Sequence, residues 1–403
     1  MPFALALSGI NAANSDLNTT ANNIANVDTV GFKESRAEFA SLFAQTQQGV
    51  SQTAIGNGVA TSEIAQQFSQ GNINSTSNNL DLALSGNGFF IVSNNGSLAY
   101  TRNGAFQVDA NGYLVTASGE RVQGYAPLSN GGFNTGGLSD LQLTTSEVAP
   151  QATSTANVTL NLPSNATAPT TAFNPTDSTS YNNTTSLTVY DSLGAAHTAQ
   201  LYFIKTATPN TWNAQLYIDG NSVGTPQTLT YSSAGTLTSP TNGQVNFGTY
   251  NPPTGASAMN ITFNLGTSTQ YGDTFGVNAI SQNGYTTGSL TGINISQTGV
   301  VQANFTNGQS KTLGQVALAN FENPQGLAQT GNTQWLQTFD SGAAVHGVAG
   351  GSGFGTIQSG ALEQSNVNIT EQLVHMITAQ RDFQANAQMI NTANMVTQAV
   401  LKL

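Results

Sequence analysis

The sequence predicts a multidomain α+β protein, with paired, coiled-coil-like N- and C-terminal α-helices and two mainly antiparallel β domains of sandwich or barrel type. Two observations predict this class. Apolar residues recur in steps of three and four near both ends of the chain, which is the spacing of one stripe along a helix. The interior instead alternates apolar and polar residues in short runs that Gly, Asn and Asp interrupt, as antiparallel strands and their turns do.

The two apolar stripes predict the helical domain. The N-terminal stripe consists of Phe3, Leu7, Ile10, Leu17, Ala21 and Ile24. The C-terminal stripe consists of Ile369, Leu373, Met376, Phe383, Ala387, Ile390 and Leu401, with Gln380, Asn394 and Thr397 at the positions between. We therefore expect residues 1–27 and 364–403 to form one terminal helical domain.

A stripe of this kind usually marks the core-facing side of a helix in an ordinary domain, but two features favour assembly instead. The stripes lie at the extreme ends of the chain, where order is commonly lost. Polar residues at seam positions, such as Asn14 and Gln380, weaken an isolated helix pair while they help to fix its register. We expect copies of the chain to bury the remaining apolar faces, which couples folding of the ends to polymerisation.

Alternating runs and turn dipeptides predict the β domains. Residues 259–265 alternate with the period of a half-buried strand. Asn103-Gly104 and Asn111-Gly112 predict hairpin turns, because both central positions of a tight turn can take positive φ. Hairpins without intervening helices favour sandwiches or barrels over a parallel sheet.

A Thr-, Ala- and Pro-rich stretch from about Thr144 to Pro175 marks a domain boundary. We expect an inner β domain made of residues 80–145 and 283–363, and an outer β domain, residues 146–282, inserted in it. Residues 28–79 are expected to form an extended or helical connector between the first helix and the inner domain.

Composition excludes several classes of function. Only 7% of the 403 residues are charged, against about 25% in ordinary soluble domains. The net charge is -11 and Lys and Arg do not cluster, which disfavours nucleic-acid binding. No apolar run approaches the ~18 residues that membrane insertion needs. Cysteine is absent, which excludes disulfides, thiolate metal sites and cysteine nucleophiles.

The same composition raises a question about export. A low charge, many Thr, Asn and Gly residues and no cysteine are typical of secreted bacterial surface proteins. The first twenty residues nevertheless lack the basic and continuous apolar regions of a cleaved signal peptide. We therefore expect an export route that needs no cleaved leader.

The histidines and carboxylates give little support for catalysis. His197, His346 and His375 lie far apart in the sequence, so we expect a structural role for each. Asp177 and Asp191 could serve a glycosidase only if their carboxylates lay about 5 to 10 Å apart, and nothing in the sequence places them so.

Two glycine-containing segments resemble ligand loops only superficially. Residues 350–355 are glycine-rich but contain no lysine, so they do not match a phosphate-binding loop. Residues 109–112 lack the later ligands of a calcium loop and are expected to form a hairpin turn. We expect no catalytic residues, no cofactor and no metal site, and we predict that the protein is not an enzyme.

Four groups of residues carry a resemblance to a known family. Ala21 to Asn26 (ANNIAN) and Thr29 to Lys33 (TVGFK) resemble the N-terminal signature of the bacterial flagellar rod and hook axial proteins. Residues 360–367 and 379–386 resemble the matching C-terminal signature. Residues 85–90 and 100–106 resemble the inner β domain of the same family, and residues 188–194 resemble the outer domain of its hook members.

The resemblance implies a structural subunit of the flagellar hook. Such a subunit self-assembles into a flexible tubular polymer, a universal joint that transmits motor torque from rod to filament. It implies an extracellular location in the hook of the bacterial flagellum. The implied partners are copies of the chain itself, the distal rod protein, the hook cap protein, the first hook-filament junction protein and the flagellar type III export apparatus.

The resemblance also indicates the residues of the assembly interface. On the terminal helices these are Phe3, Leu7, Ile10, Leu17, Ala21, Asn22, Asn23, Ile24, Asn26, Leu373, Met376, Gln380, Arg381, Phe383, Ala387 and Ile390. The resemblance separately indicates Gly31, Phe32 and Lys33 as the functional residues of the connector. The alternatives are a distal-rod-type axial protein of the same family and, remotely, a secreted glycan-active enzyme or adhesin.

Overall fold

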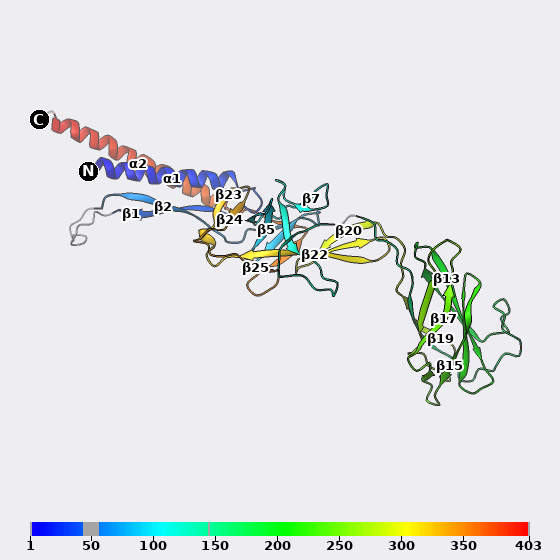
Figure 1. Ribbon diagram of the computed structural model, residues 1–403. Helices are drawn as coiled ribbons and strands as arrows, with labels where there is room; N and C mark the ends of the chain where they lie inside the picture. The colour runs from blue at the N-terminus through cyan, green and yellow to red at the C-terminus, as the bar shows by residue number, and fades with distance from the viewer. Residues whose placement is uncertain (1, 43–55, 144–145, 402–403) are drawn as a thin grey trace. The chain divides into compact units, whose positions relative to one another are not determined.

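The computed structural model describes residues 2–42, 56–143 and 146–401, and the chain divides into two compact units (Figure 1). Unit 1 comprises Met1–Thr145, Gly292–Asn304 and Ser310–Leu403, and unit 2 comprises Ser146–Thr291 and Phe305–Gln309. Together they confirm the predicted class: two terminal helices packed together, and several mainly antiparallel β sheets.

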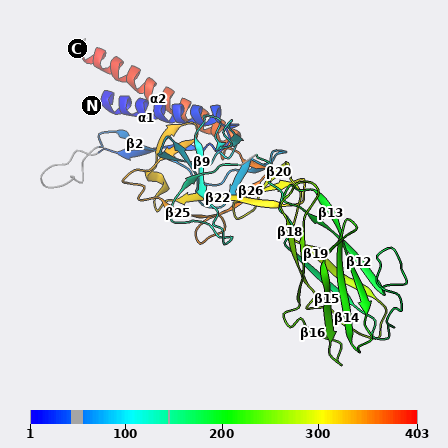
Figure 2. The same ribbon diagram turned by 45° about the vertical axis from the view of Figure 1, so that its right-hand side comes forward.

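The two helices of unit 1 lie side by side in both ribbon views (Figures 1 and 2). Helix α1 spans Pro2–Ala25 and helix α2 spans Ile369–Leu401. The Asn368 side chain caps α2, because its Oδ1 accepts a hydrogen bond from the backbone N–H of Thr370 at 3.1 Å, and Glu371 adds a negative charge to the first turn. Helix α2 therefore begins at Ile369, the first residue of the predicted C-terminal stripe and five residues inside the predicted helical domain, 364–403.

Two short strands after α1 form a hairpin, β1 (Ser35–Ser41) with β2 (Val59–Gln66). Where the structure describes the predicted connector, its regular secondary structure is strand and not helix. Residues 43–55 lie outside the described residues. Two further small sheets connect this region to the chain before α2: β3 (Ile73–Ser75) with β27 (Ala361–Glu363), and β4 (Leu82–Ser85) with β26 (Thr356–Ser359).

The main sheet has the central strand order β20-β21-β22-β9-β5-β6-β24-β23. These strands are, in chain order, β5 (Phe89–Asn94), β6 (Ser97–Thr101), β9 (Arg121–Tyr125), β20 (Leu290–Ile295), β21 (Val300–Phe305), β22 (Ser310–Asn320), β23 (Ala328–Gly331) and β24 (Gln334–Leu336). At its margins lie β7 (Gln107–Val108), β8 (Leu114–Val115), β10 (Ser139–Asp140) and β25 (Val345–Val348), and a short 3-10 helix, η1, spans Pro324–Gly326.

The apolar run of β5 is continuous because both faces of the strand are covered. Phe90 and Val92 belong to one buried cluster, while Phe89 and Ile91 belong to a second cluster with Trp335. A strand buried on both faces has no need of polar alternation, which explains why residues 89–92 contain no polar residue.

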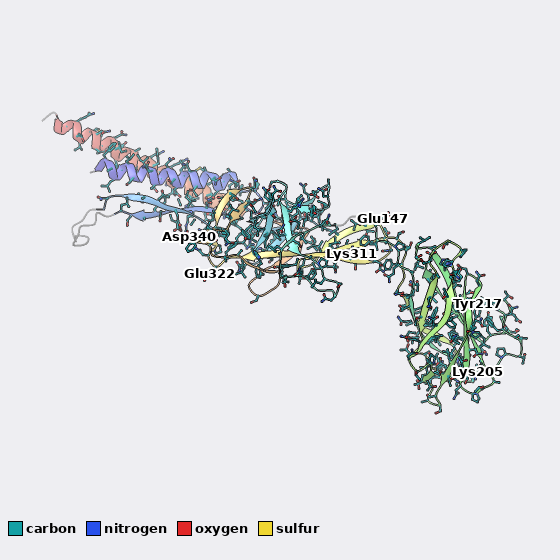
Figure 3. The ribbon with its side chains drawn as sticks, viewed as in Figure 1. Glu147, Lys205, Tyr217, Lys311, Glu322 and Asp340 are labelled. Carbon is teal, nitrogen blue, oxygen red and sulfur yellow. The ribbon has the colours of Figure 1, made fainter. Side chains whose placement is uncertain are left out.

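Unit 2 is a sandwich of two sheets around one core. One sheet has the order β12-β13-β14-β15-β16, with bounds Asn183–Tyr190, Ala196–Lys205, Thr211–Ile218, Asn221–Tyr231 and Leu237–Ser239. The other has the order β17-β18-β11-β19, with bounds Gln244–Tyr250, Met259–Asn264, Thr155–Asn161 and Gly276–Gln282. Phe203 and Trp212 from the first sheet and Val158 and Phe263 from the second share one buried cluster. Lys205 and Tyr217 mark its first sheet in Figure 3.

Of the two dipeptides predicted to form hairpin turns, Asn111-Gly112 does and Asn103-Gly104 does not. Asn111-Gly112 lies in the turn between β7 and β8, where Gly112 has φ +81°. Asn103-Gly104 joins no hairpin, because β6 pairs with β5 and β24 instead. Gly104 is needed there for close contact: a Cβ atom on it would lie 1.7 Å from the carbonyl oxygen of Leu82. Gly is required for this backbone approach and not for a tight turn.

Unit 2 begins at the residue predicted for the outer domain but ends later. The backbone N–H of Gln151 donates to the carbonyl of Tyr285, and the N–H of Thr306 donates to the carbonyl of Ser289, both at 2.9 Å. These bonds hold residues 283–291 and 305–309 in unit 2, whereas the sequence predicted 283–363 for the inner domain.

Candidate assembly site

The buried residues of α1 and α2 are mostly small or polar. Ala6, Ala13 and Thr20, spaced seven residues apart on α1, are buried, and so is Ala379 on α2. A Cβ atom on Gly9 would lie 2.5 Å from Oδ1 of Asn386, so the two helices approach closely at that level. The sequence signal for this contact is a seven-residue repeat of small residues, which the apolar stripe did not include.

The large apolar residues of the predicted stripes are not fully buried in the single chain. Phe3, Leu7, Leu373 and Phe383 are 51%, 44%, 46% and 39% exposed. The structure half-buries Ile10, Leu17, Ile24, Met376, Ala387 and Ile390, and it leaves Ala21, Asn22, Gln380 and Arg381 exposed. The exposed apolar face of the helix pair therefore has no partner among the described residues.

An open apolar groove of about 700 Å³ lies along the C-terminal half of α2. Phe3 of α1 forms one wall, and Ala385, Met389, Ala393 and Val396 of α2 contribute the apolar lining. Helix α2 has 33 residues and α1 has 24, so the last turns of α2 extend past the start of α1 (Figure 1).

Asn23 of the ANNIAN segment is buried and joins three elements. Its Nδ2 donates hydrogen bonds to the Ser35 carbonyl at 2.7 Å and to Oε1 of Gln372 at 3.0 Å. Its Oδ1 accepts the Ser35 backbone N–H at 2.9 Å. Gln372 in turn donates to the carboxylate of Glu34 at 2.9 Å. Asn23 therefore fastens α1 to β1 and α2.

The neighbouring asparagines of the motif end the helix. Nδ2 of Asn26 donates to the Asn22 carbonyl at 3.0 Å, and Thr29 donates its hydroxyl to Oδ1 of Asn26 at 3.1 Å. The Asn22 carbonyl also accepts the Asn26 backbone N–H at 3.2 Å, so the backbone and side chain of Asn26 together close the last turn of α1.

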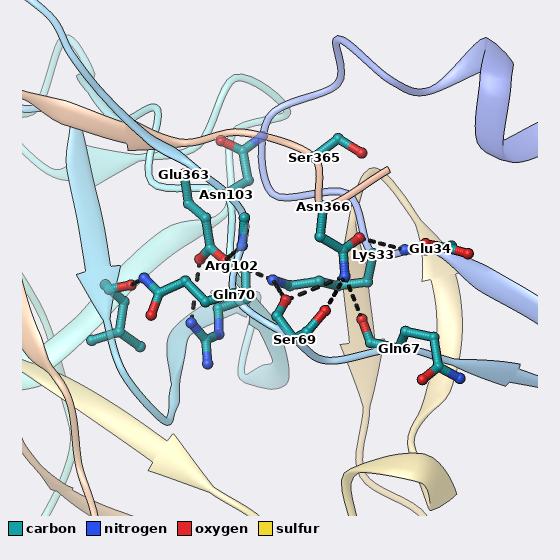
Figure 4. A network of polar contacts seen from close by, with 12 residues as sticks. Lys33, Glu34, Gln67, Ser69, Gln70, Arg102, Asn103, Glu363, Ser365 and Asn366 are labelled. Atoms are coloured by element: carbon teal, nitrogen blue, oxygen red, sulfur yellow. Dashed lines mark hydrogen bonds and ion pairs between the residues drawn. The ribbon is translucent and has the colours of Figure 1, made fainter. Parts of the chain in front are cut away.

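A buried ionic cluster lies where the connector meets β27 (Figure 4). The Glu363 carboxylate binds Nζ of Lys33 at 2.6 Å and Nη1 of Arg102 at 3.2 Å, and it accepts the Gly71 backbone N–H at 3.0 Å. Nζ of Lys33 also donates to the Ser69 carbonyl at 2.7 Å. The side chains of Lys33 and Glu363 are fully buried. Burial lowers the pKa of Lys33, and the Glu363 carboxylate opposes that shift.

The connector motif packs onto the inner β region beside this cluster. Gly31 has φ +70°, and a Cβ atom on it would lie 2.5 Å from the backbone nitrogen of Asn103. The Gly31 N–H donates to the Glu363 carbonyl at 2.8 Å, and Phe32 is buried. Gly31, Phe32 and Lys33 therefore fix the end of α1 to the chain that leads into α2, more than 300 residues later.

His197 in unit 2 is part of a polar cluster that braces a turn. Its Nδ1 lies 2.6 Å from Oδ2 of Asp219 and its Nε2 lies 3.2 Å from Oδ2 of Asp191. Asp191 also accepts the hydroxyl of Thr254, and Tyr250 donates to Asp219. Burial of the ring opposes protonation, but the hydrogen bonds to Asp219 and Asp191 outweigh it and raise the pKa of His197.

The other predicted chemical candidates lie in separate settings. Asp177 holds the Thr179 backbone and hydroxyl in its own loop, so it shares no partner with Asp191. His346 lies on β25, and His375 lies on α2 beside Glu371 at 3.8 Å. Across residues 2–42, 56–143 and 146–401, no three or more His, Cys, Asp or Glu side chains are grouped to hold a metal ion. Neither described helix is long and apolar enough to cross a membrane.

Four family models match the chain in order. They are "Flagella basal body rod protein" (residues 4–33), "Flagellar hook protein FlgE/F/G D1 domain" (83–172), "Flagellar basal body protein FlaE D2 domain" (161–285) and "Flagellar basal body rod FlgEFG protein C-terminal" (358–403). Flagellar hook protein FlgE of Escherichia coli is 39% identical, with 100% of each chain covered. The chain belongs to the flagellar hook protein family.

Further relatives agree with this assignment. Flagellar hook protein FlgE of Salmonella typhimurium is 38% identical with 100% of both chains covered, and that of Borreliella burgdorferi is 35% identical with 98% of both covered. The crystal structure of Helicobacter pylori flagellar hook protein FlgE2 has a TM-score of 0.53 at 15% identity, covering 72% of this chain and 100% of that one. That likeness concerns the fold alone.

Family membership identifies the chain as a structural subunit of the flagellar hook, located in the flagellum. It supports self-assembly into the hook and association with components of the basal body. The rod-type and glycan-active alternatives are not favoured.

Proposed function

We propose that the terminal helices assemble the hook by burying their exposed apolar faces against neighbouring copies. The observation that carries this proposal is that one set of residues on α1 and α2 joins the two helices and another set remains exposed. Gly9 lies against Asn386 and Asn23 donates to Gln372, which joins the two helices within the chain, while Phe3 and Phe383 remain exposed. Burying one such large side chain contributes about 1.5–3 kcal/mol, so many identical contacts along a polymer hold it together cooperatively.

The junction around Asn23 and Glu363 supports a role in transmitting torque. A rotating helix pair can drive the β regions only if its base is rigid. The Asn23–Gln372–Glu34 bonds and the Lys33–Glu363–Arg102 cluster supply that rigidity with buried, directional contacts. The assembled chain would thereby act as a universal joint that carries motor torque from rod to filament.

Unit 2 has the surface expected of a sliding contact. Its large apolar exposed residues among those described are Leu193, Tyr271, Val277 and Ile280. Contacts between copies through such a mainly neutral polar surface are easily exchanged for water. Neighbouring outer domains can therefore shift past one another as the hook bends.

The other proposed partners are the proteins that a hook polymer would meet at its two ends. They are the distal rod protein at one end of the polymer, and the hook cap protein and first hook-filament junction protein at the other. We propose that subunits reach the growing end, outside the cell, through the flagellar type III export apparatus.

Substitution of Phe383 tests the assembly face. We expect Phe383→Asp to abolish elongation of sheared polymer fragments by purified subunits, because a carboxylate cannot be buried there without a counter-charge. The far-ultraviolet circular dichroism of the β regions should stay unchanged. Sedimentation of the polymer measures the effect.

Two matched variants complete the test. Phe383→Leu keeps an apolar side chain and should elongate polymers, whereas Gln384→Asp adds the same charge at the adjacent exposed position and should be tolerated. Normal elongation by Phe383→Asp, or an equal block by Gln384→Asp, would contradict a role for the apolar face.

A further inference from the structure

The turn between β5 and β6 carries an open Asn-Gly pair, Asn95-Gly96. Asn95 has φ +50° and Gly96 has φ +94°, and Asn94 pairs with Ser97 across the hairpin. The pair therefore forms the centre of a two-residue turn, which is the usual position of Asn-Gly in a hairpin. Both residues are exposed, and a Cβ atom on Gly96 would meet no other atom within 4 Å. The backbone of this turn thus has room to change its dihedral angles.

The asparagine side chain of an Asn-Gly pair can react with the backbone that follows it. The backbone nitrogen of the glycine attacks Cγ of the asparagine, and the absence of a Cβ atom on glycine leaves that approach unobstructed. A bond forms between the nitrogen and Cγ, the bond between Cγ and Nδ2 breaks, and the side-chain amide leaves as ammonia with the proton that the backbone nitrogen loses. Water then opens the resulting succinimide to aspartate or to isoaspartate, whose main chain continues through Cγ. The sum consumes one water and releases one ammonia, without an oxidant or a reductant.

Two neighbouring side chains hold the reacting groups of this pair. The Gly96 N–H donates to Oγ of Ser93 at 3.1 Å. A hydroxyl both accepts and donates hydrogen bonds, so Ser93 can take the proton of the attacking nitrogen and pass another one to water. Nδ2 of Asn95 donates to Oδ1 of Asn94, also at 3.1 Å, which holds the leaving amide group. Among the described residues, Oδ1 of Asn95 accepts no hydrogen bond, so this carboxamide is tied only to one exposed neighbouring side chain.

Five other Asn-Gly pairs have a carboxamide that is bound to the backbone. In four of them Oδ1 accepts the backbone N–H two residues later at 3.0–3.1 Å, namely in Asn103, Asn130, Asn242 and Asn307. In the fifth, Oδ1 of Asn283 accepts the N–H groups of Ser154 and Thr155 at 3.0 Å, and its Nδ2 donates to Oγ of Ser154 at 2.9 Å. These bonds must break before Cγ can turn toward the glycine nitrogen.

The remaining three pairs have an enclosed glycine. A Cβ atom on Gly58 would lie 2.2 Å from Oγ of Ser8, and one on Gly112 would lie 2.8 Å from the carbonyl oxygen of Leu143. Gly88 is buried. Such packing opposes the backbone rotation that ring closure needs. The β5–β6 turn thus differs from the eight other Asn-Gly pairs of the sequence, because both its carboxamide and its glycine are open.

We propose that Asn95 is a site of spontaneous deamidation. The product adds a negative charge to a chain whose net charge is already -11. The new carboxylate lies at a cavity that is also lined by Arg121, Asp109 and Asp140. The isoaspartate product lengthens the main chain between β5 and β6, so the turn of an aged chain differs in shape as well as in charge.

Incubation of the purified full-length protein in mildly alkaline buffer tests the site. Peptide mass spectrometry follows the conversion of every Asn-Gly pair in one sample, and an isoaspartate methyltransferase labels the isoaspartate product. We expect Asn95 to convert about tenfold or more faster than Asn283 and Asn307, since freeing a bonded carboxamide adds the loss of a hydrogen bond to the barrier. In denaturant the three sites should convert at similar rates, because glycine follows each of them.

Two results of this experiment would contradict the proposal. Equal rates at Asn95 and Asn283 in the folded protein would overturn it. A preference for Asn95 that persists in denaturant would overturn the structural assignment, because the folded turn would then have no part in the selectivity.

Two variants test the groups that react. Asn95→Gln keeps a carboxamide on the turn but moves it one carbon away from the Gly96 nitrogen, and it should abolish the conversion. Ser93→Ala removes the proton acceptor of that nitrogen and should slow the conversion of Asn95 several-fold, while Asn130 in the same sample keeps its rate. Faster conversion of Asn95 in Ser93→Ala would mean that the hydroxyl restrains the nitrogen, and it would overturn the role assigned to Ser93.

Discussion

At the scale of single residues, Glu363 holds the base of the helical domain. One buried carboxylate serves two cations, Lys33 and Arg102, which lie 330 and 261 residues before it in the sequence. Removing one partner of a buried ion pair costs more than the pair contributes, because the remaining charge stays buried without compensation. Substitution of Glu363 should therefore lower the free energy of unfolding more than substitution of Lys33.

We expect Glu363→Gln to destabilise unit 1 by about 3–5 kcal/mol. Gln preserves the shape of the side chain but leaves both Lys33 and Arg102 without a counter-charge. Lys33→Met should cost less than half as much, because Glu363 keeps Arg102 and the Gly71 N–H and Met fills the space of the lysine stem. Denaturant unfolding of the monomer measures both values. Equal costs would contradict the assignment of Glu363 as the shared partner.

At the scale of secondary-structure elements, α1 and α2 form a pair that is incomplete in the single chain. The apolar residues buried on the two helices, Ala6, Ala13 and Ala379, are small, so their burial stabilises little of the helix length that must be ordered. The base of the pair is fastened through Asn23 and Gln372, but the far end of α2 extends beyond α1. Order should therefore decrease from the base of the helices toward the chain ends.

Hydrogen exchange can measure this gradient. We expect the amides of Leu7, Leu17, Phe383 and Ile390 to exchange rapidly in the monomer and slowly in the polymer, because neighbours supply the missing burial. The amide of Phe203 in unit 2 should be protected in both states and serves as the internal control. Strong protection of the four helical amides in the dilute monomer would mean that the helix pair is ordered without neighbouring copies, which would contradict this prediction.

At the scale of the whole molecule, the two units have separate hydrophobic cores, and we expect each to unfold in its own transition. The pH dependence of the unit 2 transition follows from the His197 cluster. Its hydrogen bonds hold the pKa of Asp191 at about 2 against desolvation, below the ordinary 3.8, so this stabilisation is present above pH 3.8 and is lost as the pH falls. The raised pKa of His197 stabilises unit 2 below pH 6.5, and this effect is lost as the pH rises through the folded value.

The cluster should therefore stabilise unit 2 most between about pH 4 and pH 6.5. We expect His197→Gln to lower the free energy of unfolding of unit 2 by about 1.5–3 kcal/mol at pH 5, and by less at pH 9, while unit 1 is unaffected. His375→Gln on exposed α2 is the control and should leave the unit 2 transition unchanged at both pH values. A cost of His197→Gln that does not depend on pH would contradict the charge-assisted role of the ring.

Much of the fold could be predicted because its signals are local. Strand alternation in residues 259–265 follows from which side of the strand is buried. The spacing of the apolar stripes predicted two helices, although Phe3, Leu7, Leu373 and Phe383 of those stripes are exposed in the single chain. The terminal motifs indicated the family, and the connector residues Gly31 to Lys33 proved to lie at the junction with the inner β region.

The sequence by itself determined the class of the protein, its helical ends and its β interior, because periodicity depends only on neighbours along the chain. The tertiary structure decided which face of α1 meets α2, since Gly9 allows the close approach of Asn386 while Phe3 and Leu7 stay exposed. It also decided that Asn103-Gly104 makes room for Leu82 and that Glu363 meets Lys33. These outcomes depend on contacts between residues far apart in the sequence, and apart from the repeat of small residues on α1 they leave no mark in local spacing.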